Sequence, residues 1–65
     1  MTDFTEYYAN LYWVEDNKEY FMYQAGPWYS ESIAKQMAAK YQKEELDFHV
    51  GAVIRSHITS IAPGD

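Results

Sequence analysis

The chain has 65 residues and no Cys, and its ten acidic side chains outnumber five basic ones, giving a net charge of −5. A chain of this length forms one domain, and the lack of Cys excludes disulfides and thiolate metal sites. The acidic balance disfavours binding to a phosphate backbone, which needs Lys and Arg, and permits contact with a basic partner surface.

The apolar content of 48% predicts a folded chain. No apolar run approaches the roughly 20 residues of a membrane span, and the acidic start at residues 1–6 is unlike a signal peptide. We therefore expect a soluble, cytoplasmic protein. Seven Tyr, three Phe and two Trp are more aromatic side chains than so small a core needs. The surplus should reach the surface, where Tyr and Trp are typical of binding faces.

Residues 8–14 and 19–24 are rich in aromatic and β-branched side chains and predict two strands joined by a hairpin loop at 15–18. A two-residue turn at Asp16 and Asn17 would pair Trp13 with Tyr20 and Leu11 with Met22. A longer loop with a bulge would shift that pairing. Because register decides which face each side chain takes, the exposed aromatics stay undetermined.

Pro27 cannot donate to a strand ladder, so residues 25–27 should end the second strand. Ser30 is typical of a helix N-cap, and a helix is expected from Glu31 to about Leu46. One apolar stripe combines large side chains with alanines that allow close packing on a sheet: Ile33, Met37, Tyr41, Ala34 and Ala38. The solvent side is expected to hold Lys35, Gln36, Lys40, Gln42, Lys43 and Glu44.

Residues 48–61 alternate in the manner of a third strand, with Ser56 as a bulge or an end. The better core face holds Phe48, Val50, Ala52, Ile54 and Ile58. The other face holds His49, Gly51, Val53, Arg55, His57 and Thr59.

The predicted fold is α+β with the order ββαβ: a three-stranded antiparallel sheet with one helix packed on one face. Residues 1–65 form a single domain with tails at 1–6 and 62–65. One helix can cover only one face of the sheet, so the other face stays open unless a partner or a second copy binds it.

No catalytic or metal constellation is found. His49 and His57 would lie roughly 26 Å apart along one strand, too far to share a metal ion. Ser56 and His57 would point to opposite faces, which makes them a poor nucleophile and base. We expect no metal, no cofactor and no enzymatic activity.

The open face and the hairpin are the candidate binding surface for another protein. The predicted anchors are Arg55, Tyr12, Trp13, Tyr20 and Tyr23, and the predicted electrostatic partners of a basic surface are Glu15, Asp16 and Glu19. Three alternatives stay open: a homodimer through the same face, base stacking on the aromatics, and an acidic mimic of DNA.

The segments 53–56 and 61–63 resemble the last strand and the Ala-Pro tail of the small inhibitors of host RNA polymerase from T7-like bacteriophages. Those inhibitors are acidic, of similar length, and built from a hairpin, one helix and a final strand. The resemblance implies an inhibitor acting in the host cytoplasm, with Arg55 contacting the polymerase. A second strand arginine of that family is missing here.

Residues 23–28, followed by a helix that reaches Ala38 and Ala39, are also similar to the peptidoglycan-binding repeats of bacterial division proteins. Those repeats have two β-α-β halves, and this chain has no second predicted helix.

Overall fold

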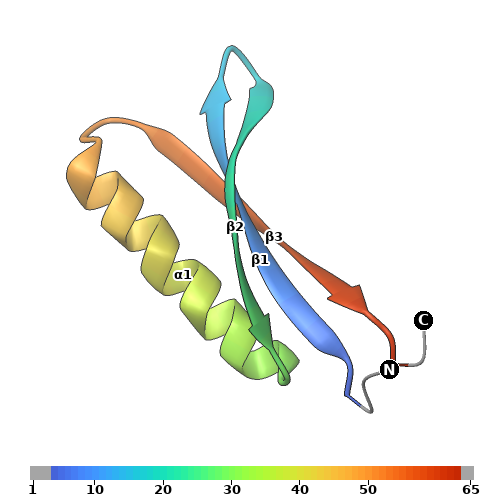
Figure 1. The fold of residues 1–65 in the computed structure, drawn as a ribbon. Coiled ribbons are helices and arrows are strands. Elements are labelled where there is room, and N and C mark those ends of the chain that lie inside the picture. Colours follow the sequence, from blue (N-terminus) through green and yellow to red (C-terminus); the bar gives the residue numbers. More distant parts are fainter. Residues whose placement is uncertain (1–3, 64–65) are drawn as a thin grey trace.

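The computed structural model describes residues 4–63, and it confirms the α+β class. The chain runs through β1 (Glu6–Glu15), β2 (Lys18–Trp28), α1 (Glu31–Phe48) and β3 (Val53–Ile61). The three strands form one antiparallel sheet in the order β2-β1-β3, and α1 lies along one of its faces (Figure 1). Within residues 4–63, no helix has both the length and the apolar character that crossing a membrane requires.

The β1–β2 hairpin closes with the two-residue turn. Asp16 and Asn17 have φ values of 52° and 65°, as a type I′ turn requires, and Trp13 pairs with Tyr20. Further along, the register shifts between Leu11 and Tyr12, so Leu11 pairs with Tyr23. The expected pairing of Leu11 with Met22 is therefore wrong, because a bulge follows a turn of the predicted length.

β2 does not end at residues 25–27 as predicted but continues to Trp28. Pro27 is tolerated because β2 is an edge strand and a second register shift occurs between Tyr7 and Ala9. Gly26 has a φ of 129°, and a Cβ there would lie 2.9 Å from the carbonyl oxygen of Tyr7. This position therefore needs glycine.

α1 begins as predicted, with the Ser30 hydroxyl accepting a hydrogen bond from the Ile33 amide at 3.4 Å. Ala34 and Ala38 are buried, but Ile33 is 48% exposed, so it is not part of the core stripe. The placement of Gln42 on the solvent side is wrong. Its side chain donates to the Ile54 carbonyl and accepts from the Ser56 hydroxyl, which fastens α1 to β3.

The predicted strand at residues 48–61 is wrong in its first part. α1 extends to Phe48, and the connection passes through Gly51, whose φ of 87° suits glycine. Phe48 and Val50 are exposed rather than buried, whereas Ile54 is in the core as predicted. β3 pairs with β1 without a register shift, so no bulge forms at Ser56.

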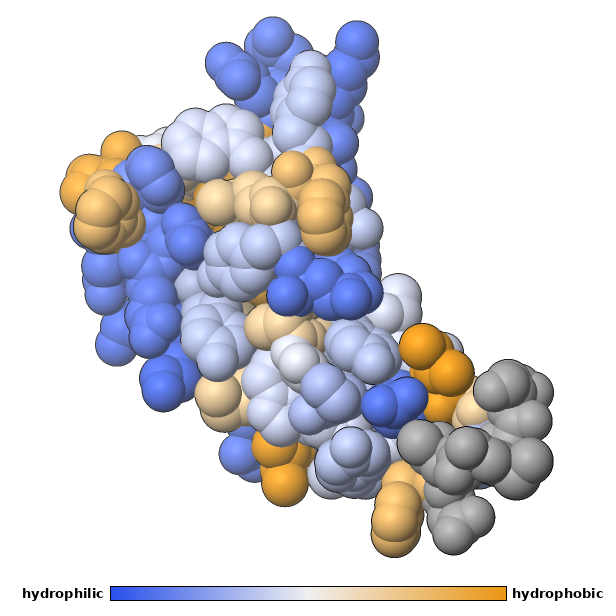
Figure 2. Space-filling view, in the orientation of Figure 1, coloured by the Kyte–Doolittle hydropathy of each residue, from blue (hydrophilic) through white to orange (hydrophobic). Residues whose placement is uncertain are grey.

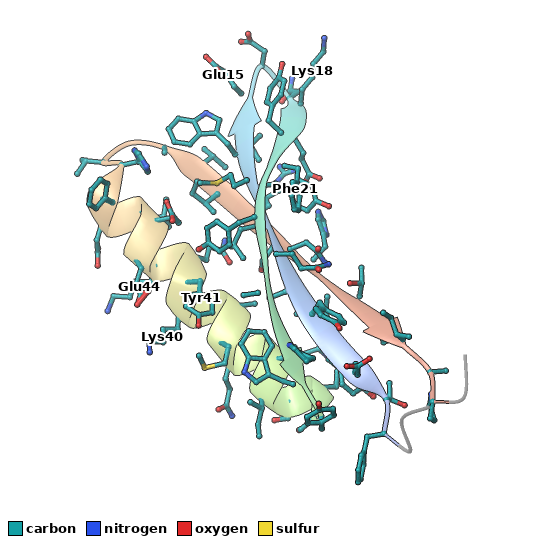
Figure 3. All side chains as sticks on the ribbon, in the orientation of Figure 1. Glu15, Lys18, Phe21, Lys40, Tyr41 and Glu44 are labelled. Carbon is teal, nitrogen blue, oxygen red and sulfur yellow. The ribbon has the colours of Figure 1, made fainter. Side chains whose placement is uncertain are left out.

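The core lies between α1 and the sheet. Its fully buried members are small or aliphatic, and partly buried aromatics close its sides: Ala9, Leu11, Ala38 and Ile54, with Trp13, Tyr23, Trp28 and Tyr41 around them. The rings of Tyr23 and Trp28 lie 6.4 Å and 6.3 Å from that of Tyr41, which points from α1 toward the sheet (Figure 3). Part of the aromatic surplus thus supplies the bulk that the helix alanines lack.

Candidate binding face

The sheet face opposite α1, called the open face here, has no further element of residues 4–63 over it (Figure 1). Directly paired residues share a face, so strand pairing identifies its members. They come from all three strands: Tyr8, Asn10, Tyr12 and Val14; Glu19, Phe21 and Gln24; Val53, Arg55, His57 and Thr59. Aromatic, cationic and carboxylate side chains therefore meet on one surface.

Glu19 organises the charges of the open face. From β2 its carboxylate reaches two side chains of β3: Oε1 lies 3.0 Å from Nε2 of His57 and Oε2 lies 3.4 Å from Nη1 of Arg55. The hydrogen bond to His57, with further contributions from the charges of His57 and Arg55, lowers the pKa of Glu19, while desolvation opposes the shift. The side chains of Arg55 and His57 stay 60% and 52% exposed, so both are available to a partner.

Three rings form a row across the strands beside this charge cluster. The ring of Tyr12 lies 5.8 Å from that of Phe21 and 5.1 Å from that of His57, both edge to face. Phe21 is 60% exposed and lies on the side of β2 away from α1 (Figure 3). The rings of Tyr12 and Phe21 give the open face an apolar area next to its charges.

Asn10 forms the buried base of the open face, with only 5% of its surface exposed. Its amide nitrogen donates to the His57 carbonyl and the Thr59 hydroxyl, both at 3.1 Å, and its amide oxygen accepts from the Gln24 amide at 2.9 Å. One side chain thus joins all three strands. Sequence reasoning missed it, although a lone Asn inside an otherwise apolar central strand is a usable signal.

The predicted site residues fall into three groups. Tyr12, Glu19 and Arg55 lie together on the open face. Glu15 and Asp16 are exposed at the hairpin tip. The remaining three, Trp13, Tyr20 and Tyr23, are on the helix side of the sheet, as their strand pairing requires.

The residues on the helix side do not join the open face. The Trp13 ring packs 5.1 Å from that of His49. Burial, together with the nearby Glu45 carboxylate, raises the pKa of Tyr23. The predicted shared strand face of His49 and His57 is wrong, because His49 caps the end of α1. Phe21 also lies on the open face, paired with Tyr12, although it was not among the predicted anchors. The two-residue turn fixes this pairing, and the bulge that follows places Tyr23 on the helix side.

Among the described residues, no group of three or more His, Cys, Asp or Glu side chains is arranged to hold a metal ion, and no pocket is found. The candidate site on residues 4–63 is therefore the open face and not a cavity. The sequence matches no protein-family model, and comparisons with curated proteins and with solved structures find no match. A proposal about function therefore rests on the residues of the open face.

Proposed function

We propose that this chain is a small acidic protein-binding module that holds another protein on its open face and changes that protein's activity. The observation that supports this proposal is the exposed cluster of Glu19, Arg55 and His57 beside the rings of Tyr12 and Phe21. Arg and Tyr are enriched at the energetic centres of interfaces, and an open sheet face without a pocket among residues 4–63 suits a protein partner.

The cluster is pre-organised for binding. Arg55 makes a 3.4 Å contact with Glu19 through Nη1, and a guanidinium has five donors in all. Glu19 therefore limits the freedom of the arginine while leaving donors for a partner carboxylate or carbonyl. Ordering side chains before association lowers the entropic cost of binding.

The concrete partner we propose is bacterial RNA polymerase, inhibited in the manner of the small phage proteins that the last strand resembles. Arg55 is the residue of that resemblance, and it lies within the cluster on β3. The acidic Glu15 and Asp16 at the hairpin tip would face a basic part of the partner, which speeds association and selects the partner's orientation.

Purified bacterial RNA polymerase core tests this proposal through a binding titration and a transcription assay. Arg55→Ala and Tyr12→Ala should each weaken binding about tenfold or more, as expected of interface anchors. Lys35→Ala removes the same charge from α1, where Lys35 pairs with Glu31, and should bind like the unaltered protein. The proposal fails if the polymerase does not bind, or if folded Arg55→Ala and Tyr12→Ala proteins bind equally well.

A homodimer through the free edge of β3 is a second candidate. β3 pairs with β1 along Val53–Ile61 without a register shift, whereas the other edge strand, β2, has two shifts and Pro27. An unbroken edge is the more able to pair with another strand. Sedimentation at about micromolar concentration separates the candidates, because a tight dimer contradicts a monomeric inhibitor.

A further inference from the structure

The end of α1 carries an apolar surface apart from the open face. Phe48 is 85% exposed and Val50 is 93% exposed, more than any other large apolar side chain of the described residues. These two residues are called the helix-end patch here. Figure 2 shows apolar atoms gathered at the junction of α1 and β3, at the edge of the view and next to hydrophilic atoms of α1. Surfaces of this kind are typical of interaction sites.

The backbone around the patch presents both side chains to solvent. The connection after α1 is a tight turn closed by a hydrogen bond from the Ala52 amide to the His49 carbonyl at 3.1 Å. A Cβ on Gly51 would meet no atom of the described residues within 4 Å, so the space beside this glycine is open. Phe48 contacts the His49 ring at 5.4 Å. Neither Phe48 nor Val50 belongs to the core cluster, so folding does not explain them.

Carboxylates lie beside Phe48 on α1, because residues three and four positions apart are neighbours on a helix surface. Glu44, Glu45 and Asp47 lie near the end of α1, and the last turn contains no basic residue. A helix C-terminus carries partial negative charge and favours cations, so these carboxylates are poorly placed for helix stability. Glu45 meets His49 at 3.6 Å, while Glu44 lies on the side of α1 away from the sheet (Figure 3).

We propose that the helix-end patch docks a cationic amphipathic segment of a partner protein. The apolar side of that segment would cover Phe48 and Val50, and its Lys or Arg side chains would meet Glu44 and Asp47. Charge complementarity selects this occupant, because the patch combines exposed apolar area with a carboxylate rim on a chain of net charge −5. A second copy of the chain would bring the same negative charges together.

Trp13 is a built-in reporter of docking. Its ring lies 5.1 Å from that of His49, which in turn contacts Phe48. A ligand that covers Phe48 should therefore change the fluorescence of Trp13. Trp28 is the other tryptophan of the chain, so the Trp28→Phe protein isolates the signal, and amide shifts at 46–51 by NMR supply a measurement that needs no substitution.

The test is a titration with a synthetic amphipathic helical peptide of leucine and lysine. We expect saturable binding that weakens with salt, and at least tenfold weaker binding by Phe48→Ser and by Val50→Ser. Ile33→Ser is the matched control, because Ile33 is 48% exposed in the first turn of the same helix. Arg55→Ala should bind the peptide normally, so this inference can fail or succeed independently of the proposed function.

Three results would overturn the inference. The first is equal binding of a leucine and glutamate peptide with the same apolar side, which would remove the role of charge. The second is unchanged binding by folded Phe48→Ser and Val50→Ser proteins, or no binding at all. The third is sedimentation that shows a dimer which Phe48→Ser dissociates, because the occupant would then be a second copy.

Discussion

The two faces of the sheet use neighbouring residues of the same strand for different purposes. On β1, Leu11 is completely buried against the helix layer, while the next residue, Tyr12, contacts the rings of Phe21 and His57 on the open face. The covered face holds fully buried small and aliphatic side chains with partly buried aromatic rings around them. The open face holds polar side chains joined by hydrogen bonds, with aromatic rings beside them.

This division has an energetic consequence. The molecule measures 41 × 20 × 14 Å along its principal axes, so it is only two layers thick. Apolar burial is concentrated on the covered face, because the core cluster lies between the sheet and α1. Substitutions on the covered face should therefore change stability, and substitutions on the open face should mainly change binding. The predictions below test this separation.

Leu11→Ala should have the largest effect on stability. Leu11 is the largest side chain that is fully buried, and its truncation leaves a cavity worth about 2–5 kcal/mol of unfolding free energy. The matched variant is Phe21→Ala, at an open-face position that is 60% exposed, which should cost under about 1 kcal/mol. Urea denaturation followed by circular dichroism measures both. Equal losses would show that the two faces share the stability.

Ala38→Leu tests the close approach of α1 to the sheet. Ala38 is 3% exposed within the core cluster, so a larger side chain must push the helix away, at a cost of about 1–3 kcal/mol. Its neighbour Ala39 is exposed, and Ala39→Leu should change the unfolding free energy by less than about 0.5 kcal/mol. If both variants unfold at the same urea concentration, the helix does not depend on a small residue there.

Much of the covered face could be predicted because local chemistry determines it. Asp16 and Asn17 tolerate positive φ and set the turn, Ser30 accepts the first helical amide, and the spacing of Ala34 and Ala38 identifies the packed side of the helix. Each of these signals acts within a few residues. They were sufficient for the ββαβ order and for the uncovered sheet face.

The members of the open face could not be predicted in full, because they depend on long-range pairing. The hairpin turn places Phe21 opposite Tyr12 on the open face, and the bulge between Leu11 and Tyr12 then places Tyr23 opposite Leu11 on the helix side. The prediction of a strand at residues 48–52 was wrong for a different reason. Their apolar alternation is typical of a strand, but the helix continues to Phe48 and a turn at Gly51 follows. Alternation alone does not separate a strand from a helix end joined to a turn.

Asn10→Ala should have an intermediate effect on the unfolding free energy. Asn10 is an exception to the division between the two faces, because it belongs to the open face but is buried. Removing this side chain takes away the hydrogen-bond partner of the Gln24 amide and of the His57 carbonyl. The unfolding free energy should fall by about 1–3 kcal/mol. Gln24→Ala, at an exposed position, should cost less. Chemical denaturation checks both, and a cost for Asn10→Ala as small as that for Gln24→Ala would mean that water replaces the network.

Glu19→Gln should have the smallest effect and the clearest pH dependence. The pKa of Glu19 is lowered from its ordinary value of 4.5 in the folded protein, first by the hydrogen bond from His57. The resulting stabilisation is present above the ordinary value and is lost as the pH falls through the lower, folded value. Glu19→Gln should therefore be less stable than the unaltered protein near pH 6, and the difference should shrink as the pH falls below about 4.5.

Substituting His57 and Arg55 one at a time shows which of the two contacts lowers the pKa of Glu19 more. The pKa of Glu19 can be measured in each variant by an NMR titration of its side chain. His57→Ala should bring this pKa closer to 4.5 than Arg55→Ala does, because the 3.0 Å contact with His57 is the shorter one and the main cause of the shift. The reverse order would make Arg55 the principal partner of Glu19. Arg55 would then be committed to an internal ion pair, and its availability to a binding partner would be reduced.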